Sequence, residues 1–311
     1  MEKKYSNFNL KIKNLFIAFC RGVAGIQPIL RDLSYTVEWI EHQFQNSRNR
    51  TVKPEMILSS NELEHTILLE SKLGGNIDKE QYDRYKDITN VDLKERAYLN
   101  ARCVENIDIT YVIPEEVIDK AADAFNELAI DSALVSIGET KTKLYKNDFK
   151  IEKLNLVFRT GIDVNYDEIP TNFIPFDVES SEWFIAEKIF PIILSFLFEN
   201  KSSFTDEDIL REIIPLWSDI GSNEKGEMRK KILKVLRSAS KYEFKEFIKQ
   251  NKDISRVTHT NTWIIIKNPL QRLPSKRSMA WRQLKNLQLN FLERLKTGRG
   301  LPIQTSLFDD L

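Results

Sequence analysis

Two short segments with a strand-like period of two, residues 52–58 and 65–69, constrain the fold of this chain more than any other feature. The polar residues 59–62 join them, and Gly74 and Gly75 end the second segment. Short segments of this period, bounded by turn-forming residues, are typical of neighbouring strands. A helical pattern follows at residues 78–88, where Asp78 can cap the helix. We therefore expect strands and helices to share one α/β domain.

Further elements extend this α/β pattern to residue 145. The additional predicted elements are helices at residues 8–22, 33–46 and 115–128 and strands at residues 107–113 and 133–137. The helix at 33–46 is predicted from apolar residues spaced by four, three and four positions, at Leu33, Val37, Ile40 and Phe44. Alternating elements of this kind indicate one compact domain over residues 1–145.

The second half of the chain has a different organisation. Residues 146–179, in which 154–159 resemble a strand, are predicted to be a connector. The elements expected after it are helices at 182–199, 205–217 and 224–249 and short strands at 254–258 and 262–267. Three helices followed by a hairpin predict a mostly helical, winged-helix-like DNA-binding domain over residues 180–268. Residues 269–311 are expected to form a basic segment and a flexible tail.

Composition argues against several classes of protein. Lysine plus arginine and aspartate plus glutamate are balanced at 46 each, so the net charge does not indicate a partner. Two distant cysteines argue against disulfides and zinc sites, and three scattered histidines argue against histidine-based nucleases. The N-terminus lacks the apolar core of a signal peptide, and the apolar run 183–198 contains Glu187 and Lys188. We therefore expect a cytoplasmic protein without a membrane span.

Charged residues lie at the ends of the two predicted strands. Glu55 begins the first strand, and alternation points Glu70 and Lys72 of the second to the same side. Mg²⁺ prefers oxygen ligands and keeps several waters, so Glu55 and Glu70 are a sufficient candidate pair for Mg²⁺ or Mn²⁺. Lys72 would orient the attacking water or stabilise charge on a phosphodiester. Gln81 and Tyr85 are four residues apart and share one face of the next helix.

The segments Pro54-Glu55, Leu68-Leu69-Glu70-Ser71-Lys72 and Gln81-x-x-x-Tyr85 resemble the PD-(D/E)xK (restriction-endonuclease-like) nuclease superfamily, in its RecB-like branch. The resemblance covers roughly residues 30–140, and the strand, helix and strand at 107–137 also fit that fold. The resemblance implies that Glu55 and Glu70 are the metal ligands and that Lys72 is the catalytic lysine. It also implies that Gln81 and Tyr85 form the helix motif. Glu41 or Glu38 would be the acid that the superfamily often carries on its first helix.

The chain departs from that superfamily at two points. Glu55 stands where the superfamily usually has aspartate, and a longer side chain changes the geometry at the metal. The strand expected between the first helix and Pro54 is very short or missing in the sequence pattern.

Structural explanations compete with this interpretation. An E-x-K pair on a strand, as at Glu70 and Lys72, is commonly a solvated surface pair. Asp78 and Gln81 also match a capping box, in which Gln81 would only close the start of the helix. Tyr85 can be a core residue, and Glu55 an ordinary carboxylate at the start of a strand. The order and spacing of the motifs favour the nuclease interpretation.

Two basic regions are candidate DNA-binding surfaces. In the predicted helix 224–249, the basic residues that share one face are Lys230, Lys234, Arg237 and Lys241. Such a stripe can neutralise phosphates, although an ordinary solvated helix face has the same pattern. Residues 267–299 hold nine lysines or arginines against one acid, Glu293. The candidates for DNA contact there are Lys276, Arg277 and Arg282.

The C-terminal residues contain a short motif that resembles a known protein-binding peptide. Gln304, Leu307 and Phe308 resemble the bacterial sliding-clamp-binding motif, in which a glutamine and a Leu-Phe pair enter an apolar pocket. The alternative is that Leu307 and Phe308 fold back onto the protein itself or onto a sister subunit, because exposed apolar side chains are costly.

These observations predict a metal-dependent deoxyribonuclease, a phosphodiester hydrolase that acts in restriction, antiviral defence or DNA repair. The first alternative is a catalytically weak or inactive nuclease-fold DNA-binding subunit. Such a subunit would serve a separate ATPase or helicase partner, because the chain contains no P-loop motif. The second alternative is a regulator that uses the winged helix alone.

Overall fold

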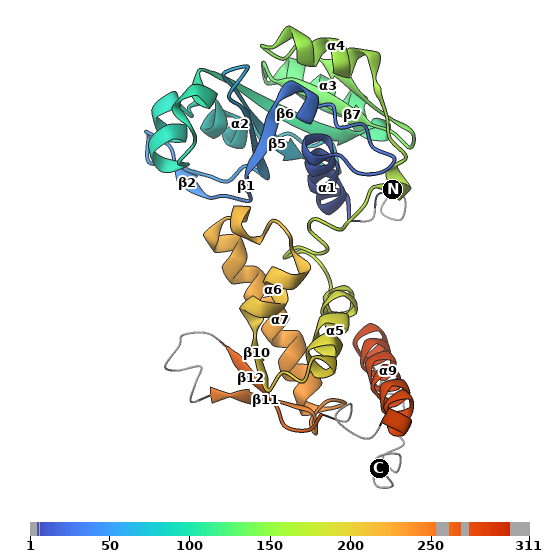
Figure 1. Cartoon of the computed structure of the whole chain (residues 1–311). Helices are drawn as coiled ribbons and strands as arrows, with labels where there is room; N and C mark the ends of the chain where they lie inside the picture. The colour runs from blue at the N-terminus through green and yellow to red at the C-terminus, as the bar shows by residue number, and fades with distance from the viewer. Residues whose placement is uncertain (1–4, 6, 253–260, 269–273, 299–311) are drawn as a thin grey trace. The chain divides into compact units, whose positions relative to one another are not determined.

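The computed structural model describes residues 5, 7–252, 261–268 and 274–298, and it describes no side chains at 101 and 274–277. The protein is mixed α/β, as the sequence predicted (Figure 1). It divides into two compact units. The first unit comprises Met1–Ile174 and Ser218–Lys225, and the second comprises Pro175–Trp217 and Gly226–Leu311.

The first unit is built on a seven-stranded sheet with the order β1-β4-β5-β6-β7-β8-β9. Its strands are β1 (Tyr35–Ile40), β4 (Met56–Ser60), β5 (His65–Ser71), β6 (Asn106–Pro114), β7 (Ala133–Ile137), β8 (Lys141–Lys146) and β9 (Ile162–Asp163). The pairs β5/β6 and β6/β7 are parallel, and the other neighbours are antiparallel. A separate ribbon is formed by β2 (Phe44–Gln45) and β3 (Thr51–Val52).

Helices cover both faces of this sheet. The helices of the first unit are α1 (Phe8–Arg21), α2 (Lys79–Lys86), α3 (Ile118–Glu127) and α4 (Glu152–Thr160). On one face α1 meets α4, where the ring of Phe16 stacks on Phe158. On the other face, α2 and α3 share a buried apolar cluster that contains Tyr82. Adjacent side chains of a strand point to opposite faces, and accordingly Glu70 contacts α2 while Ser71 contacts the start of α1.

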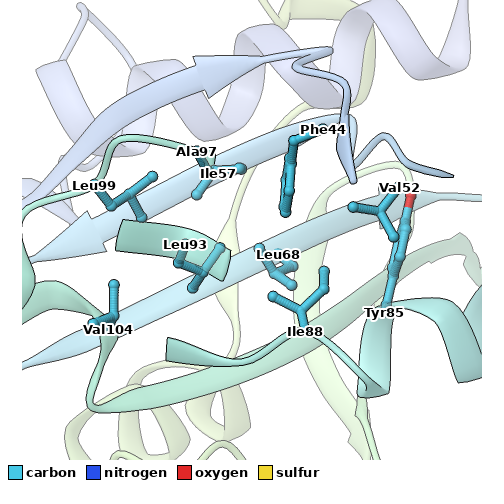
Figure 2. Packing of buried hydrophobic residues seen from close by; sticks show 10 residues of the cluster. All are labelled: Phe44, Val52, Ile57, Leu68, Tyr85, Ile88, Leu93, Ala97, Leu99 and Val104. Atoms are coloured by element: carbon cyan, nitrogen blue, oxygen red, sulfur yellow. The ribbon is translucent and has the colours of Figure 1, made fainter. Parts of the chain in front are cut away.

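A second apolar cluster lies between the sheet, α2 and the helical turns η2 (Asp92–Arg96) and η3 (Ala101–Val104). Figure 2 shows its side chains, among them Leu68 of β5 and Tyr85 of α2. The ring of Tyr85 packs in this cluster and its hydroxyl oxygen lies beside Val52. Burial of these side chains fixes α2 against the end of β5, where the candidate residues lie.

The second unit combines helices with a three-stranded antiparallel sheet of order β10-β12-β11. In chain order its elements are α5 (Glu182–Phe198), β10 (Ser203–Thr205), α6 (Asp206–Ile213), α7 (Ser222–Lys241), β11 (Ile248–Asn251), β12 (Thr262–Ile265) and α9 (Pro274–Thr297). The rings of Phe190, Phe244 and Phe291 contact one another in its core. Helix α7 belongs to the first unit up to Lys225 and to the second unit from Gly226.

The helix predicted at 33–46 is wrong, because the chain forms β1 and β2 there. Tyr35, Val37 and Trp39 belong to the β-branched and aromatic types that favour strands. The pairing of β1 with β4 shifts register between Val37 and Trp39. A shift of this kind breaks the alternation of faces, so the apolar spacing imitates that of a helix.

Other predicted elements differ in extent. The segment 154–159 is helical, as part of α4, because Leu154 and Phe158 lie one turn apart on its buried side. The helix predicted at 205–217 ends at Ile213, two residues before Pro215, which disfavours helix in its neighbour. The helix predicted at 224–249 ends at Lys241.

The remaining predicted elements agree with the structure in type. These are the helices at 8–22, 78–88, 115–128 and 182–199 and the strands at 65–69, 107–113, 133–137 and 262–267, with small shifts at their ends. The strand predicted at 52–58 is divided, because Pro54 has no backbone N–H to donate: Val52 ends β3, and β4 begins at Met56. The predicted strand at 254–258 lies outside the described residues. Within the part of the chain that the structure describes, no helix is long and apolar enough to cross a membrane.

Candidate active site

Glu70 is the centre of the candidate site. It lies near the end of β5 and is only 5% exposed. Its Oε1 accepts hydrogen bonds from Lys72 Nζ at 2.8 Å and from Gln81 Nε2 at 2.8 Å. The hydroxyl of Tyr85 lies 3.1 Å from its Oε2. Three side chains, one from the residue after β5 and two from α2, therefore fix this carboxylate.

The capping of α2 places Gln81 and Tyr85. The side chain of Asp78 accepts hydrogen bonds from the backbone N–H groups of Glu80 and Gln81, so the helix starts at Lys79. One turn apart on α2, Gln81 and Tyr85 then face Glu70 together. The Gln81 amide also donates to the Tyr85 hydroxyl at 3.2 Å.

The hydroxyl of Tyr85 links Glu70 to the loop before β4. It donates to the backbone carbonyl oxygen of Lys53 at 2.7 Å. Burial first, and the charge of Glu70 second, raise the pKa of Tyr85 well above its usual value. Tyr85 therefore acts as a neutral hydrogen-bonding group that ties α2 to the segment of Lys53 and Glu55.

Glu55 lies immediately before β4 and is 8% exposed. Its backbone N–H donates to Leu69 of β5, which sets it across from Glu70. Its Oε2 accepts a hydrogen bond from Ser71 Oγ at 2.6 Å, and the same hydroxyl lies 3.0 Å from Asn9 of α1. Burial first, and repulsion by Glu70 second, raise the pKa of Glu55 to about 8. Near neutral pH this carboxyl therefore holds a proton in the absence of a cation.

A second network of charges surrounds Glu41. Lys13 of α1, only 3% exposed, donates to Glu41 Oε1 at 2.9 Å. Lys53 Nζ lies 2.9 Å from Glu41 Oε2 and 3.0 Å from Glu224 Oε2. Two ammonium groups and two carboxylates thus alternate beside Glu55, in a chain of ion pairs in which Lys53 is the most exposed member.

Electrostatics of this network keep its central groups charged. Burial opposes ionisation of Glu41, but Lys13 and Lys53 outweigh burial and lower the pKa of Glu41. Burial likewise opposes charge on Lys53, but Glu41 and Glu224 outweigh it and raise the pKa of Lys53. Burial, followed by Glu41, raises the pKa of Glu224. Glu41 also has a left-handed backbone with φ of 54°, a strained conformation that the ion pairs help to hold.

The structure brings together Glu70, Lys72, Gln81 and Tyr85 directly, and it sets Glu55 across from Glu70. Glu41 does not lie on a helix, as the resemblance implied, but in the loop after β1. The other candidate for that position, Glu38, lies apart from this cluster and accepts hydrogen bonds from Thr36 and Ser59.

The structure argues against two of the structural explanations, the solvated surface pair and the capping box. Glu70 and Lys72 are not a solvated surface pair, because Glu70 is buried. The Gln81 side chain donates to Glu70 and Tyr85, so it reaches into the site while Asp78 alone caps the helix through its side chain.

Four residues of the site were missed from the sequence. Lys13 carries a weak signal, since it is a lysine between apolar residues of a buried helix. Strand alternation places Ser71 on the face away from Glu70, and there its hydroxyl donates to Glu55. Lys53 and Glu224 pair across 171 positions of the chain, and no pattern in the sequence indicates such a contact.

Carboxylate oxygens suit a hard divalent cation, and Glu55 and Glu70 lie close enough for their charges to repel each other. A cation beside both would relieve the repulsion that contributes to the raised pKa of Glu55. Among the described residues, no group of three or more histidine, cysteine, aspartate or glutamate side chains is placed to hold a metal ion. A cation at this pair would therefore take two carboxylates and complete its shell with water, as Mg²⁺ commonly does.

The predicted DNA-binding residues of α7 are exposed. They are Lys230, Lys234, Arg237 and Lys241. Lys230 pairs with Glu227 on the same helix at 2.6 Å, and Lys234 pairs with Glu182 of α5. Arg282 of α9 is also exposed. The side chains of Lys276 and Arg277, and the peptide residues Gln304, Leu307 and Phe308, lie outside the described residues.

The first unit is thus an α/β/α domain with a buried cluster of carboxylates and lysines at the end of its central strands. Residues 9–174 match the model of the MJECL32 domain, so the chain belongs to the MJECL32 domain family. The match includes every residue of the candidate active site except Glu224. No curated protein and no solved structure matches the chain.

Proposed function

We propose that the protein is a DNA nuclease that depends on Mg²⁺ or Mn²⁺ and hydrolyses phosphodiester bonds. One observation carries the proposal: Glu70 is buried and held at once by Lys72, Gln81 and Tyr85. A buried acid with a lysine beside it, across from a second acid, is one set of groups that can support metal-assisted phosphodiester hydrolysis.

The order of elements in the first unit supports the same proposal. The sequence pattern lacked the strand that the PD-(D/E)xK superfamily has between its first helix and Pro54. In the structure, β1 occupies that place, between α1 and β4. The departure at Glu55 remains, because glutamate stands where the superfamily usually has aspartate.

Each side chain of the proposed site has a distinct task. A divalent cation, when bound, would polarise the phosphate and lower the pKa of a water molecule. Glu55 and Glu70 would hold that cation. Lys72 would donate to the phosphate or orient the attacking water, since its ammonium group is part-exposed and near Glu70. Gln81 and Tyr85 fix the orientation of Glu70, so that it does not reorganise during the reaction.

The second unit supports DNA as the substrate. From α5 to β12 the chain forms, in order, a helix, a strand, two helices and two antiparallel strands. The first of these strands, β10, pairs with β12 and completes a three-stranded sheet. This is the arrangement expected of a winged-helix domain, in which α7 would be the helix that approaches DNA. Exposed lysines and an arginine on α7 would supply phosphate contacts. Restriction, antiviral defence and DNA repair are the processes in which such an enzyme would act.

A second candidate function is a DNA-binding subunit of the same fold with little or no catalysis. Two observations favour it. Both oxygens of Glu70 are already engaged by protein groups, and Glu55 holds a proton near neutral pH. Such a subunit would act with a separate ATPase or helicase partner.

The decisive experiment compares Lys72→Ala with Lys79→Ala. Lys79 is a matched control, because it lies on α2, is half-exposed and pairs only locally with Asp83. We expect Lys72→Ala to lower Mg²⁺- or Mn²⁺-dependent cleavage of single- and double-stranded DNA by about 100-fold or more. DNA binding, measured by anisotropy, should persist in both variants.

Two other results would contradict the proposal. If the wild-type protein cleaves no form of DNA with either metal, with candidate ATPase partners added, the subunit function replaces the nuclease. If Lys72→Ala cleaves like Lys79→Ala, the site assignment fails.

We also propose that the C-terminal peptide binds a sliding clamp. Its basis is the sequence alone, at Gln304, Leu307 and Phe308. The double change Leu307→Ala and Phe308→Ala should abolish capture of the protein by immobilised clamp. Unchanged capture would contradict the proposal.

A further inference from the structure

A short segment from the second half of the chain is built into the first unit. Ile220 forms a parallel bridge with Ile40 at the end of β1, and the backbone N–H of Gly221 donates to Ile40 at 2.8 Å. Ile220 is 1% exposed. Asp219 lies 3.9 Å from Arg21 at the end of α1. The segment Ser218–Lys225 therefore has backbone, apolar and ionic contacts to the domain that holds the candidate site.

Gly221 makes this docking possible. A Cβ atom at this position would lie 2.4 Å from the carbonyl oxygen of Glu41 and 2.7 Å from the Cα of His42. Both neighbours are backbone atoms, which cannot turn away as a side chain could. Only glycine allows so close an approach, so the chain at residue 221 is fitted to the loop that carries Glu41.

Glu224, on the first turn of α7, places a carboxylate beside the candidate site. It is 4% exposed, and its Oε2 lies 3.0 Å from Lys53 Nζ. The same ammonium group contacts Glu41, so Lys53 is held between two carboxylates. The backbone oxygen of Lys53 accepts the hydrogen bond of Tyr85, and Glu55 follows two residues later.

We propose that Glu224 is a positioning residue of the active site, and that the segment Ser218–Lys225 completes a site which the family domain at 9–174 does not complete alone in this chain. The inference rests on the proposed metal-dependent function. Glu224 acts through Lys53, whose ammonium group it retains at Glu41. Without Glu224, this ammonium group keeps a single carboxylate partner, Glu41, and can turn toward Glu55 and Glu70 to compete there with a divalent metal.

The test measures metal binding and cleavage separately. Glu224→Gln keeps the size of the side chain and removes its charge. The control is Glu227→Gln, three residues further along α7, where Glu227 is exposed and pairs with Lys230. Mn²⁺ binding is measured by titration calorimetry, and DNA cleavage is measured as a function of Mn²⁺ concentration. We expect Glu224→Gln to weaken Mn²⁺ binding about tenfold and to raise the Mn²⁺ requirement equally, with little change in the rate at saturating metal.

Two further variants separate positioning from a general structural role. In Lys53→Met the competing ammonium group is absent, so adding Glu224→Gln to it should cause no further loss of Mn²⁺ affinity. Gly221→Ala keeps the Glu224 side chain but displaces the segment that carries it from the loop of Glu41, so it should reproduce the tenfold loss. Thermal unfolding of each variant checks that the domain remains folded.

The possible outcomes distinguish this inference from the nuclease function. If the wild type cleaves DNA and Glu224→Gln binds Mn²⁺ as the wild type does, the positioning role is wrong and the nuclease stands. If the wild type binds Mn²⁺ without cleaving, and Glu224→Gln weakens that binding, the positioning role stands and the nuclease fails. Absence of Mn²⁺ binding by the wild type would overturn both.

Discussion

The candidate site of the first unit and the basic face of α7 in the second unit use their charged residues in opposite ways. In the candidate site, Lys13, Glu41 and Glu224 are buried or nearly so and held in ion pairs. On α7, the side chains of Lys230, Lys234, Arg237 and Lys241 are exposed, and Lys230 and Lys234 pair with acids that are exposed or part-exposed. A buried charge is costly unless its partners are in place, whereas an exposed charge is solvated wherever it points.

This difference indicates two kinds of function. Charges held in fixed positions suit catalysis, because a displacement of about 1 Å strongly lowers the reaction rate. Charges on a solvated face suit binding to a phosphate backbone, in which their number matters more than their exact placement. Four measurements test this difference.

The largest expected effect is on stability. Lys13→Met removes one partner of a buried pair and leaves Glu41 with less compensation, so we expect a loss of about 3–5 kcal/mol in the free energy of unfolding. Lys234→Met, on the exposed face of α7, should change it by less than about 0.5 kcal/mol. Chemical denaturation of both variants checks this, and equal effects would remove the distinction between the units.

The next effect is a dependence on pH. Because burial and Glu70 raise the pKa of Glu55 from 4.5 to about 8, the folded protein retains a proton that the unfolded chain loses. The contribution of Glu55 to stability is therefore greatest below pH 4.5 and falls as the pH rises to about 8.

Glu55→Gln cannot ionise and should escape this loss. Relative to the wild type, its stability should rise by up to about 1.4 kcal/mol per pH unit over that interval. Thermal unfolding at a series of pH values measures the difference. Glu80→Gln, at a carboxylate that is 90% exposed, is the control and should follow the wild type. Parallel curves for Glu55→Gln and the wild type would show that Glu55 is not a buried, protonated acid.

A smaller effect is expected at Tyr85. Tyr85→Phe keeps the ring in its apolar cluster but leaves the buried carbonyl of Lys53 without its hydroxyl donor. We expect a loss of about 1–2 kcal/mol. Tyr98→Phe is the control, because Tyr98 is 76% exposed. A stability equal to the wild type would show that the hydroxyl does not tie α2 to the loop of Lys53.

The smallest effect per residue is expected on α7. Replacing Lys230, Lys234 and Arg237 by alanine should leave stability unchanged and weaken DNA binding evenly across sequences. The slope of log affinity against log salt concentration should fall by up to about 2.7, which is about 0.9 for each phosphate contact. An unchanged slope would show that this face does not contact DNA.

Local parts of the site were predictable from the sequence. Glu70, Lys72, Gln81 and Tyr85 lie within 16 residues, and the geometry of one strand and one capped helix is enough to bring them together. Strand alternation put Glu70 and Lys72 on one side, and the four-residue spacing of α2 put Gln81 and Tyr85 on one face.

The remaining parts depend on tertiary contacts. The strand β1 was mistaken for a helix, because its irregular pairing with β4 gives it a helical apolar spacing. The ion pair of Lys53 with Glu224 spans 171 positions, and only the docking of Ile220 against Ile40 brings the two residues together. Contacts of this kind have no periodic signature, so a single sequence does not indicate them.

The route of the chain through residues 218–225 limits how this protein can be divided or recombined. A fragment that stops at residue 174 keeps every strand of the seven-stranded sheet. It loses Glu224, which pairs with Lys53, and the segment Ser218–Lys225, which contacts the end of β1. Grafting another C-terminal half onto such a fragment would have the same result unless the graft supplied both a glycine and a glutamate at matching positions. The two halves are therefore not interchangeable modules, and they would be expected to change together over evolutionary time.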